Sequence, residues 1–260
     1  MKNKLIGLTL GLMIVAGLLI GSILLNHKPV ESGDIRYTLT WTWGDAVGTE
    51  TGWQVTNDLG YTINVEKGYL VSHSVQLIAC EDDAENAGLL DDIFGANTAE
   101  AGHGGDENDP SALLIPQIEN LAQVTTIDFG AVNVPFQRYC TAHYLVARSD
   151  GLTTNMPDDI DMYGKSLYLE GTYQAADSDA VVAFSLQTSL ANGKIVDIRP
   201  SIDSEPVRLE VSDEGIHINI QRQLDTLFDG VDFLTMDSDE QARTVLWSLI
   251  RDTQVLVSER

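Results

Sequence analysis

Short runs of alternating apolar and polar residues, each followed by turn-forming residues, recur along most of the chain. In the run IRYTLTW, the side chains of Ile35, Tyr37 and Leu39 fall on one face of an extended strand. Further runs of this kind occupy residues 60–80, 125–149, 165–173, 180–189, 205–212 and 215–221. Many short strands joined by turns rich in Asp, Gly and Asn predict a mainly β chain, folded as an antiparallel β-sandwich.

The end of the sequence changes to helical spacing. Ser238 and Gln241 match a capping box, and the apolar residues that follow over 238–252 recur every three or four positions. This pattern predicts a C-terminal helix that covers one end or edge of the sandwich. Residues 223–230 predict one or two helical turns before it, and residues 253–258 predict a closing strand after it.

The first 32 residues differ from the rest in composition. Lys2 and Lys4 precede an uncharged run from Leu5 to Leu25, whose length of roughly 31 Å as a helix matches the hydrocarbon core of a bilayer. No small-residue cleavage pattern follows it, which favours an uncleaved signal anchor over a cleaved signal peptide. We therefore expect residues 1–32 to form an anchor and tether in the cytoplasmic membrane. Residues 33–260 would then form a single sandwich domain that faces the periplasm or exterior.

The charge balance limits the classes of partner. The chain holds 39 acidic against 15 basic residues, a formal net charge of −24, which argues against nucleic acid as a ligand. It suits a solvated surface, a cation-rich partner or a salty environment. The acids are dense in an insertion over about 81–110, which is also rich in Gly and Ala. An irregular segment of this length is usually functional or disordered.

Two cysteines, Cys80 and Cys140, are the only ones in the sequence. Outside the cytoplasm two cysteines usually pair, and this pair would close a loop of about 60 residues. A copper or zinc thiolate site is the alternative interpretation. We expect the disulfide, because thiols seldom stay reduced in an oxidising compartment.

Histidines are the main candidates for chemistry, but none lies in a spaced zinc motif, and no hydrolase nucleophile elbow is present. In the run 69–80, His73 shares a strand face with Val71, Val75 and Leu77, so it is a ligand or a buried core residue. His143 has the same two interpretations. His103 lies between glycines with no local packing partner, so it is a ligand or part of a disordered bend.

Strand geometry sets a limit on a shared histidine site. If Cys80 and Cys140 face each other on neighbouring strands, His143 lies opposite Leu77, roughly 13 Å along the strand from His73. Two imidazoles cannot hold one ion across that gap with bonds of about 2.0 Å. A bulge, a disulfide outside the ladder, or His103 reaching in from the insertion would be needed.

Acidic side chains offer a second kind of metal site. The run GDENDP places Asp106, Glu107 and Asp109 in one turn, and calcium takes oxygen ligands from such turns. The spacing does not match an EF-hand loop. A solvated run of charge is the alternative interpretation.

Several segments together resemble bacterial extracytoplasmic proteins related to the copper-associated MbnP-like, or metallo-mystery pair, group. They are VTNDLGYTINVEKGYLVSHSVQLIAC (55–80), AEAGHGG (99–105), VNVPFQRYC (132–140), GKSLYLEGTY (164–173) and INIQRQLDTLFDGVDF (218–233). The resemblance implies a secreted or anchored β-rich protein, with copper handled in some relatives through histidines and a modified tryptophan. By position the candidates are His73, His103 and His143, with Trp41, Trp43 or Trp53 as the tryptophan. The chain departs from the four-cysteine members in having two cysteines.

These patterns together predict a membrane-anchored, extracytoplasmic protein that binds a transition metal without catalysing a reaction. Copper is the expected metal, with zinc or calcium as alternatives, because imidazole suits copper and zinc and an acidic surface enriches cations. The expected ligands are His103, His73 and His143. The alternative is a structural or adhesive envelope module that binds another protein through its acidic loop.

Overall fold

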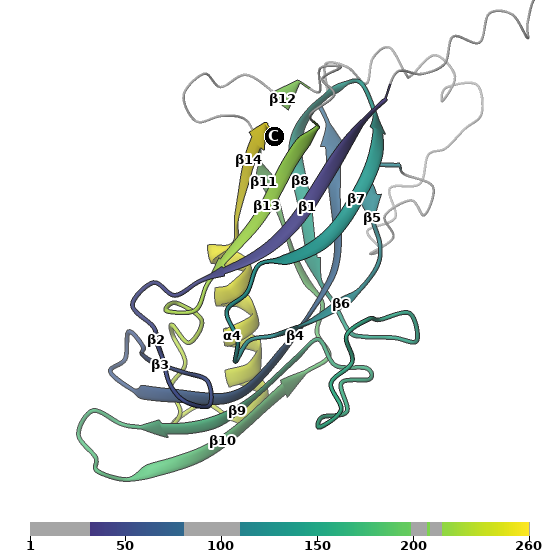
Figure 1. Ribbon diagram of the computed structural model, residues 1–260. Helices are drawn as coiled ribbons and strands as arrows, with labels where there is room; N and C mark the ends of the chain where they lie inside the picture. Colours follow the sequence, from purple (N-terminus) through teal and green to yellow (C-terminus); the bar gives the residue numbers. More distant parts are fainter. Residues whose placement is uncertain (1–31, 81–109, 199–206, 209–214, 260) are drawn as a thin grey trace, which may run out of the picture. The chain divides into compact units, whose positions relative to one another are not determined.

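The computed structural model describes residues 32–80, 110–198, 207–208 and 215–259 (Figure 1). These residues belong to one compact unit, Ser32–Arg260. The predicted anchor lies outside the described residues. So do most of the predicted insertion, His103 and the calcium candidates Asp106, Glu107 and Asp109.

The described residues form two β-sheets and one α-helix, which confirms the prediction of a mainly β fold with a C-terminal helix. The four-stranded sheet has the order β14 (Gln254–Glu259), β13 (Ile216–Gln223), β1 (Ser32–Thr42) and β7 (Ile127–Pro135). The ten-stranded sheet runs β10 (Val181–Thr188), β9 (Leu167–Gln174), β4 (Thr62–Ala79), β3 (Trp53–Thr56) and β2 (Val47–Gly48). Its remaining strands are β5 (Ala112–Leu113), β6 (Gln117–Asn120), β8 (Arg138–Val146), β11 (Asn192–Asp197) and β12 (Val207–Arg208).

One strand pair departs from the predicted antiparallel arrangement. Strands β1 and β13 run parallel, in register from Ile35 opposite Ile216 to Thr42 opposite Gln223. More than 170 residues separate the two strands along the chain, which leaves ample length for the crossover that a parallel pair requires. The prediction of a wholly antiparallel sandwich is wrong at this pair.

Strand β4 organises the ten-stranded sheet because its 18 residues serve two neighbours in succession on the same edge. Its first half pairs with β9 and its second half with β8, and the register shifts between Ser72 and Ser74. A Cβ atom added at Gly171 of β9 would lie 2.0 Å from the carbonyl oxygen of Asn64. The two backbones therefore approach so closely that only glycine fits at this point.

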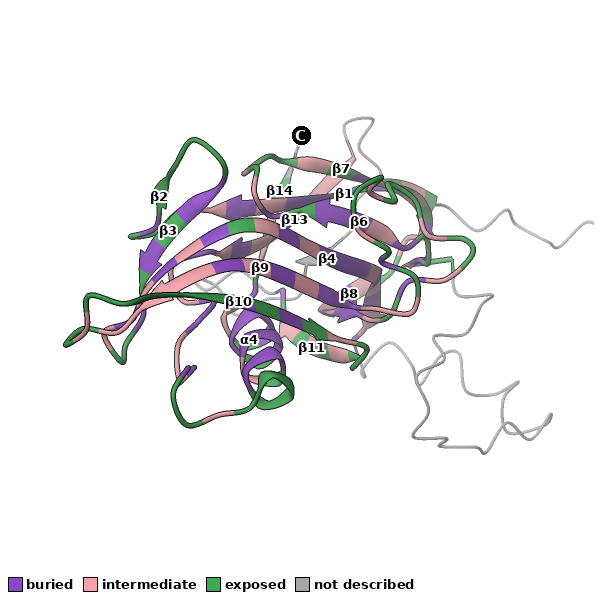
Figure 2. Ribbon diagram, turned by 90° about the horizontal axis from the view of Figure 1, so that it is seen from below, coloured by how far each residue is buried: buried purple, intermediate pink, exposed green. Residues whose placement is uncertain are grey.

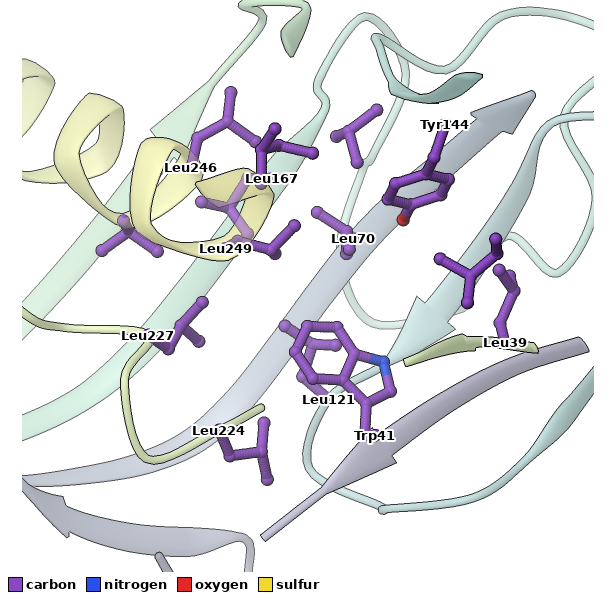
Figure 3. Packing of buried hydrophobic residues seen from close by; sticks show 14 of the residues in the cluster. Leu39, Trp41, Leu70, Leu121, Tyr144, Leu167, Leu224, Leu227, Leu246 and Leu249 are labelled. Atoms are coloured by element: carbon purple, nitrogen blue, oxygen red, sulfur yellow. The ribbon is translucent and has the colours of Figure 1, made fainter. Parts of the chain in front are cut away.

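The core lies between the two sheets and the helix α4 (Ser238–Asp252). Figure 3 shows Leu246 and Leu249 of α4 beside Leu167 of β9. The cap of the helix is Asp237, one residue before the predicted cap Ser238, since the side chain of Asp237 accepts a hydrogen bond from the Glu240 amide. Residues 225–230, part of the region predicted as helical, form successive turns instead, whereas the predicted closing strand is β14.

Candidate functional site

His73 lies on β4 at the register shift between Ser72 and Ser74. This bulge changes the predicted alternation, because Val75 and Leu77 belong to the main core whereas Val71 packs in a separate small cluster. His73 therefore lies on the face of the ten-stranded sheet that also carries Val71. We call this the outer face, and it carries Tyr69, Val71, His73, Gln76 and His143.

The imidazole of His73 is half-buried, and its Nδ1 atom is buried without a hydrogen-bond partner among the described residues. Burial lowers the pKa of His73 below its ordinary value, and the carboxylate of Asp150 opposes this only in part. The side chain is therefore a neutral imidazole near pH 7, which is the form that binds a metal ion.

His143 lies on β8 opposite Gln76, one position from the predicted partner Leu77. Its neighbours Ala142 and Tyr144 are buried in the core, so the alternation places His143 on the outer face. A Cβ atom added at Gly193 of β11 would lie 2.9 Å from the Nε2 atom of His143. The ring therefore leans over β11, on the side of β8 away from β4.

The two histidines share a face but do not meet. Three residues separate His73 from Gln76, the residue opposite His143, which corresponds to about 10 Å along the strand. His103, the third predicted ligand, lies outside the described residues. Within the described part of the chain, no group of three or more His, Cys, Asp or Glu side chains could hold a metal ion.

The predicted disulfide is confirmed. Cys80 and Cys140 are bonded, with their Cα atoms 5.0 Å apart, and the Cys80 amide donates to the carbonyl oxygen of Arg138. The bond excludes the alternative of a thiolate metal site at these two sulfurs. It joins the residue that follows β4 to β8, three residues before His143.

A buried polar cluster, which the sequence patterns did not predict, joins the two sheets. Its members are Trp41, Ser72, Glu119, Tyr144 and Arg222. Arg222 donates to both carboxylate oxygens of Glu119, at 2.7 and 2.6 Å, and both side chains are fully buried. The Arg222 guanidinium also lies 4.5 Å from the centre of the Trp41 ring.

The remaining polar atoms of this cluster are almost all paired. Trp41 Nε1 donates to Glu119 at 2.9 Å, and the Ser72 hydroxyl donates to the same carboxylate at 2.5 Å. Arg222 donates to the Tyr144 hydroxyl at 2.9 Å, while its Nε atom has no hydrogen-bond partner among the described residues. Burial opposes the charge of Arg222, but the nearby Glu119 carboxylate raises its pKa well above the ordinary value. Burial raises the pKa of Tyr144, because it disfavours the ionised phenolate.

The alternation in β13 contains the signal for this cluster. Ile218, Ile220 and Leu224 are buried, and the alternation places Arg222 on the same side as these residues. A charged residue in line with buried apolar ones indicates a buried partner of opposite charge.

The three candidate tryptophans have different surroundings. Trp41 belongs to the polar cluster, and Trp53 is fully buried with its ring centre 6.0 Å from that of Phe228. Trp43 is 37% exposed. Trp41 and Trp53 are therefore buried packing residues of the interior.

Comparisons with known proteins add no assignment, since no family model, curated protein or solved structure matches the chain. Over the described ranges, which begin at Ser32, no helix is long and apolar enough to cross a membrane.

Proposed function

We propose that this protein is a membrane-anchored, extracytoplasmic protein that binds a transition metal, copper in the first place, without catalysing a reaction. The observation that carries the proposal is the Nδ1 atom of His73. This nitrogen is buried and has no hydrogen-bond partner among the described residues. A buried polar atom without a partner costs about 1–3 kcal/mol of folding free energy, and a bound metal ion at His73 would relieve this cost.

His217 provides the contrasting case within the same fold. Its Nε2 atom lies 2.9 Å from the Thr38 hydroxyl, on the neighbouring strand β1. Such a histidine already has a structural partner. His73 and His217 therefore form a natural pair for experiments, because only His73 has an uncommitted buried nitrogen.

The chain length between His103 and the sheet allows His103 to join either His73 or His143, which do not meet each other. Gln76 of β4 pairs with Ala112 of β5 on one side and with His143 of β8 on the other. Ala112 and His143 are therefore two strand spacings, or about 10 Å, apart. His103 precedes Ala112 by nine residues, a chain length that spans up to about 30 Å. This length is sufficient for His103 to reach either of the other two histidines.

Two further observations support the location and the metal. A disulfide between Cys80 and Cys140 is typical of proteins outside the reducing cytoplasm. The resemblance to the MbnP-like group, which is associated with copper, covers segments that contain His73 and His103. Asp150, whose charge acts on His73, could add a carboxylate ligand.

The proposal is tested by titrating Cu²⁺ into the full-length protein in detergent, followed by calorimetry and by electron paramagnetic resonance. We expect His73→Ala and His103→Ala to weaken binding most, because His103 can join His73 at one ion. His143→Ala should have a smaller effect, because His143 lies about 10 Å along the strand from His73. The matched control is His217→Ala, which should leave copper affinity unchanged.

Unchanged affinity and spectrum in all three ligand variants would contradict the proposal. That outcome would favour the alternative, an envelope module that binds another protein through its acidic loop. Weakening by His217→Ala to the same extent would show that the effect comes from folding rather than from ligation.

A further inference from the structure

Strand β10 forms an end of the ten-stranded sheet and also contacts helix α4. It pairs with β9 over eight consecutive residues, from Val181 opposite Gln174 to Thr188 opposite Leu167, without a register shift. Among the described strands β9 is its only partner. Figure 2 shows β10 as a largely exposed strand. One row of its backbone N–H and C=O groups is therefore open to another strand.

The composition of β10 is unusual for this acidic chain. No charged residue or proline occurs from Ala180 to Gly193, although the whole chain carries a net charge of −24. Val181 is 64% exposed and Val182 is 41% exposed. Exposed edge strands in soluble proteins are normally protected by charges, prolines, bulges or short length.

Other described edges carry such protection. Strand β7 contains Asp128 and Pro135 and has a register shift in its pairing with β1. Strand β2 has only two residues, and β11 carries Lys194 and Asp197. Strand β14 lies against β11. The exposed, uncharged edge of β10 is therefore a specific feature rather than a general property of this fold.

The two ends of β10 carry opposite charge. Asp177 and Asp179 are exposed just before the strand. A hollow of about 390 Å³ lies at its other end, lined by Gln187, Thr188, Leu190, Lys165, Arg243 and one acid, Asp239. Lys165 donates to the carbonyl oxygen of Asp161, whereas Arg243 is exposed on α4. Trp247, one helical turn beyond Arg243, is 66% exposed.

From these features we infer that β10 is a dimerisation edge, at which a second copy of this chain adds its own β10 antiparallel across a two-fold axis. Such pairing continues the sheet across both copies, and it places no like charges opposite each other along the strand. The acidic end of each β10 then lies beside the hollow with Arg243 on the other copy.

The pleat of the strand restricts the register of this pairing. A two-fold axis perpendicular to the sheet keeps the core faces of both copies on one side and their outer faces on the other. Exposed residues of one β10 must therefore lie opposite exposed residues of the other β10. Ser185 can then lie opposite Ser185 of the second copy, with Ala183 opposite Gln187. Continuing this pairing puts Asp179 opposite Ala191, the residue after Leu190 in the hollow.

The test measures the protein mass of the full-length chain in detergent by size-exclusion chromatography with light scattering. We expect the wild type to have twice the mass of one chain. Ala183→Lys should give the monomer, because a lysine and its symmetry mate would lie within the paired edge. Ala131→Lys is the matched control, since Ala131 is an exposed alanine on the edge strand β7.

A charge exchange distinguishes a second copy from any other partner. Asp179→Lys and Arg243→Glu should each weaken the dimer, and the double variant should restore it, because every contact occurs twice across the axis. A monomeric wild type, or an Ala183→Lys variant that remains dimeric, would overturn the inference. Failure of the double variant to recover would overturn the antiparallel arrangement. Near-ultraviolet circular dichroism verifies that each variant is folded.

Discussion

The interior polar cluster and the outer face of the ten-stranded sheet place similar residues in opposite situations. Between the sheets, Arg222 and Glu119 are fully buried and form two direct hydrogen bonds to each other. On the outer face, His73 is half-buried and has a buried nitrogen without a partner among the described residues.

This difference separates polar atoms that are already hydrogen-bonded within the protein from polar atoms that are not. Buried charges that satisfy each other contribute to a unique packing of the two sheets, and they offer nothing to a ligand. A buried polar atom left unpaired on a half-buried side chain has its bonding capacity available. The comparison therefore indicates a structural role for Arg222 and Glu119, and it is the basis for the proposed binding role of His73.

The largest expected effect comes from breaking the interior pair. Arg222→Ala leaves the Glu119 carboxylate buried without its cation, and we expect a loss of about 3–5 kcal/mol in the free energy of unfolding. Urea denaturation of the wild type and the variant measures this loss. The double variant Arg222→Met with Glu119→Leu should recover much of it, because no charge then remains unpaired. A loss below about 1 kcal/mol for Arg222→Ala would contradict the structural role.

Removing the disulfide should have the next largest effect. The double variant Cys80→Ser with Cys140→Ser opens a loop with a sequence separation of 60, for which the chain-entropy model gives at most about 4 kcal/mol. Chemical denaturation under non-reducing conditions measures the difference. Copper affinity should persist where the variant is still folded, because the proposed ligands are histidines. Loss of copper binding by a folded variant would point to the sulfurs instead.

Two tyrosines compare the interior with the outer face, where Tyr168 of β9 lies opposite the outer-face residue Tyr69. Tyr144→Phe removes a buried hydroxyl that accepts from Arg222 and bonds to Ser72, and should cost about 1–3 kcal/mol. Tyr168→Phe removes a hydroxyl that donates to Glu170 at a partly exposed site, and should cost no more than about 0.5 kcal/mol. Thermal unfolding of both variants measures the two losses of stability. Equal losses would remove the distinction between the two regions.

The smallest effect concerns a carboxylate at the surface. Hydrogen bonds from the side chains of Thr235 and Tyr61 and from the Leu234 amide lower the pKa of Asp232 to about 2. Because the folded state holds the ionised form, its contribution is fully present above the unfolded pKa of about 3.9 and is lost as the pH falls towards 2. Asp232→Asn should therefore be less stable than the wild type near neutral pH, and this difference should shrink between pH 4 and 2. A difference that stays constant over that range would contradict this assignment.

Much of the fold could be predicted because its signals are local. Alternation predicted the strands, helical spacing predicted α4, and the two cysteines predicted their own bond. No glycine or proline marks the bulge at His73 in the sequence. The prediction that Val75 shares a strand face with His73 was therefore wrong. The parallel pairing of β1 with β13 depends on long-range packing, which no short pattern encodes.

The candidate site was predictable only in part. The sequence identified His73 and His143 as candidates, but their relative position depends on two register shifts in β4. The interior cluster was missed although Arg222 breaks an apolar alternation, because its partner Glu119 lies 103 residues away. Partners so distant in sequence meet only through the tertiary fold.

The most direct test of the account is the metal content of the full-length protein, extracted from the membrane fraction without chelators and exchanged into metal-free buffer. Inductively coupled plasma mass spectrometry should find about one copper or zinc ion per chain in the wild type and in His217→Ala, as expected for imidazole ligands. His73→Ala should carry far less. A wild type that is free of metal, and that stays free after equilibration with Cu²⁺, would contradict the proposed function.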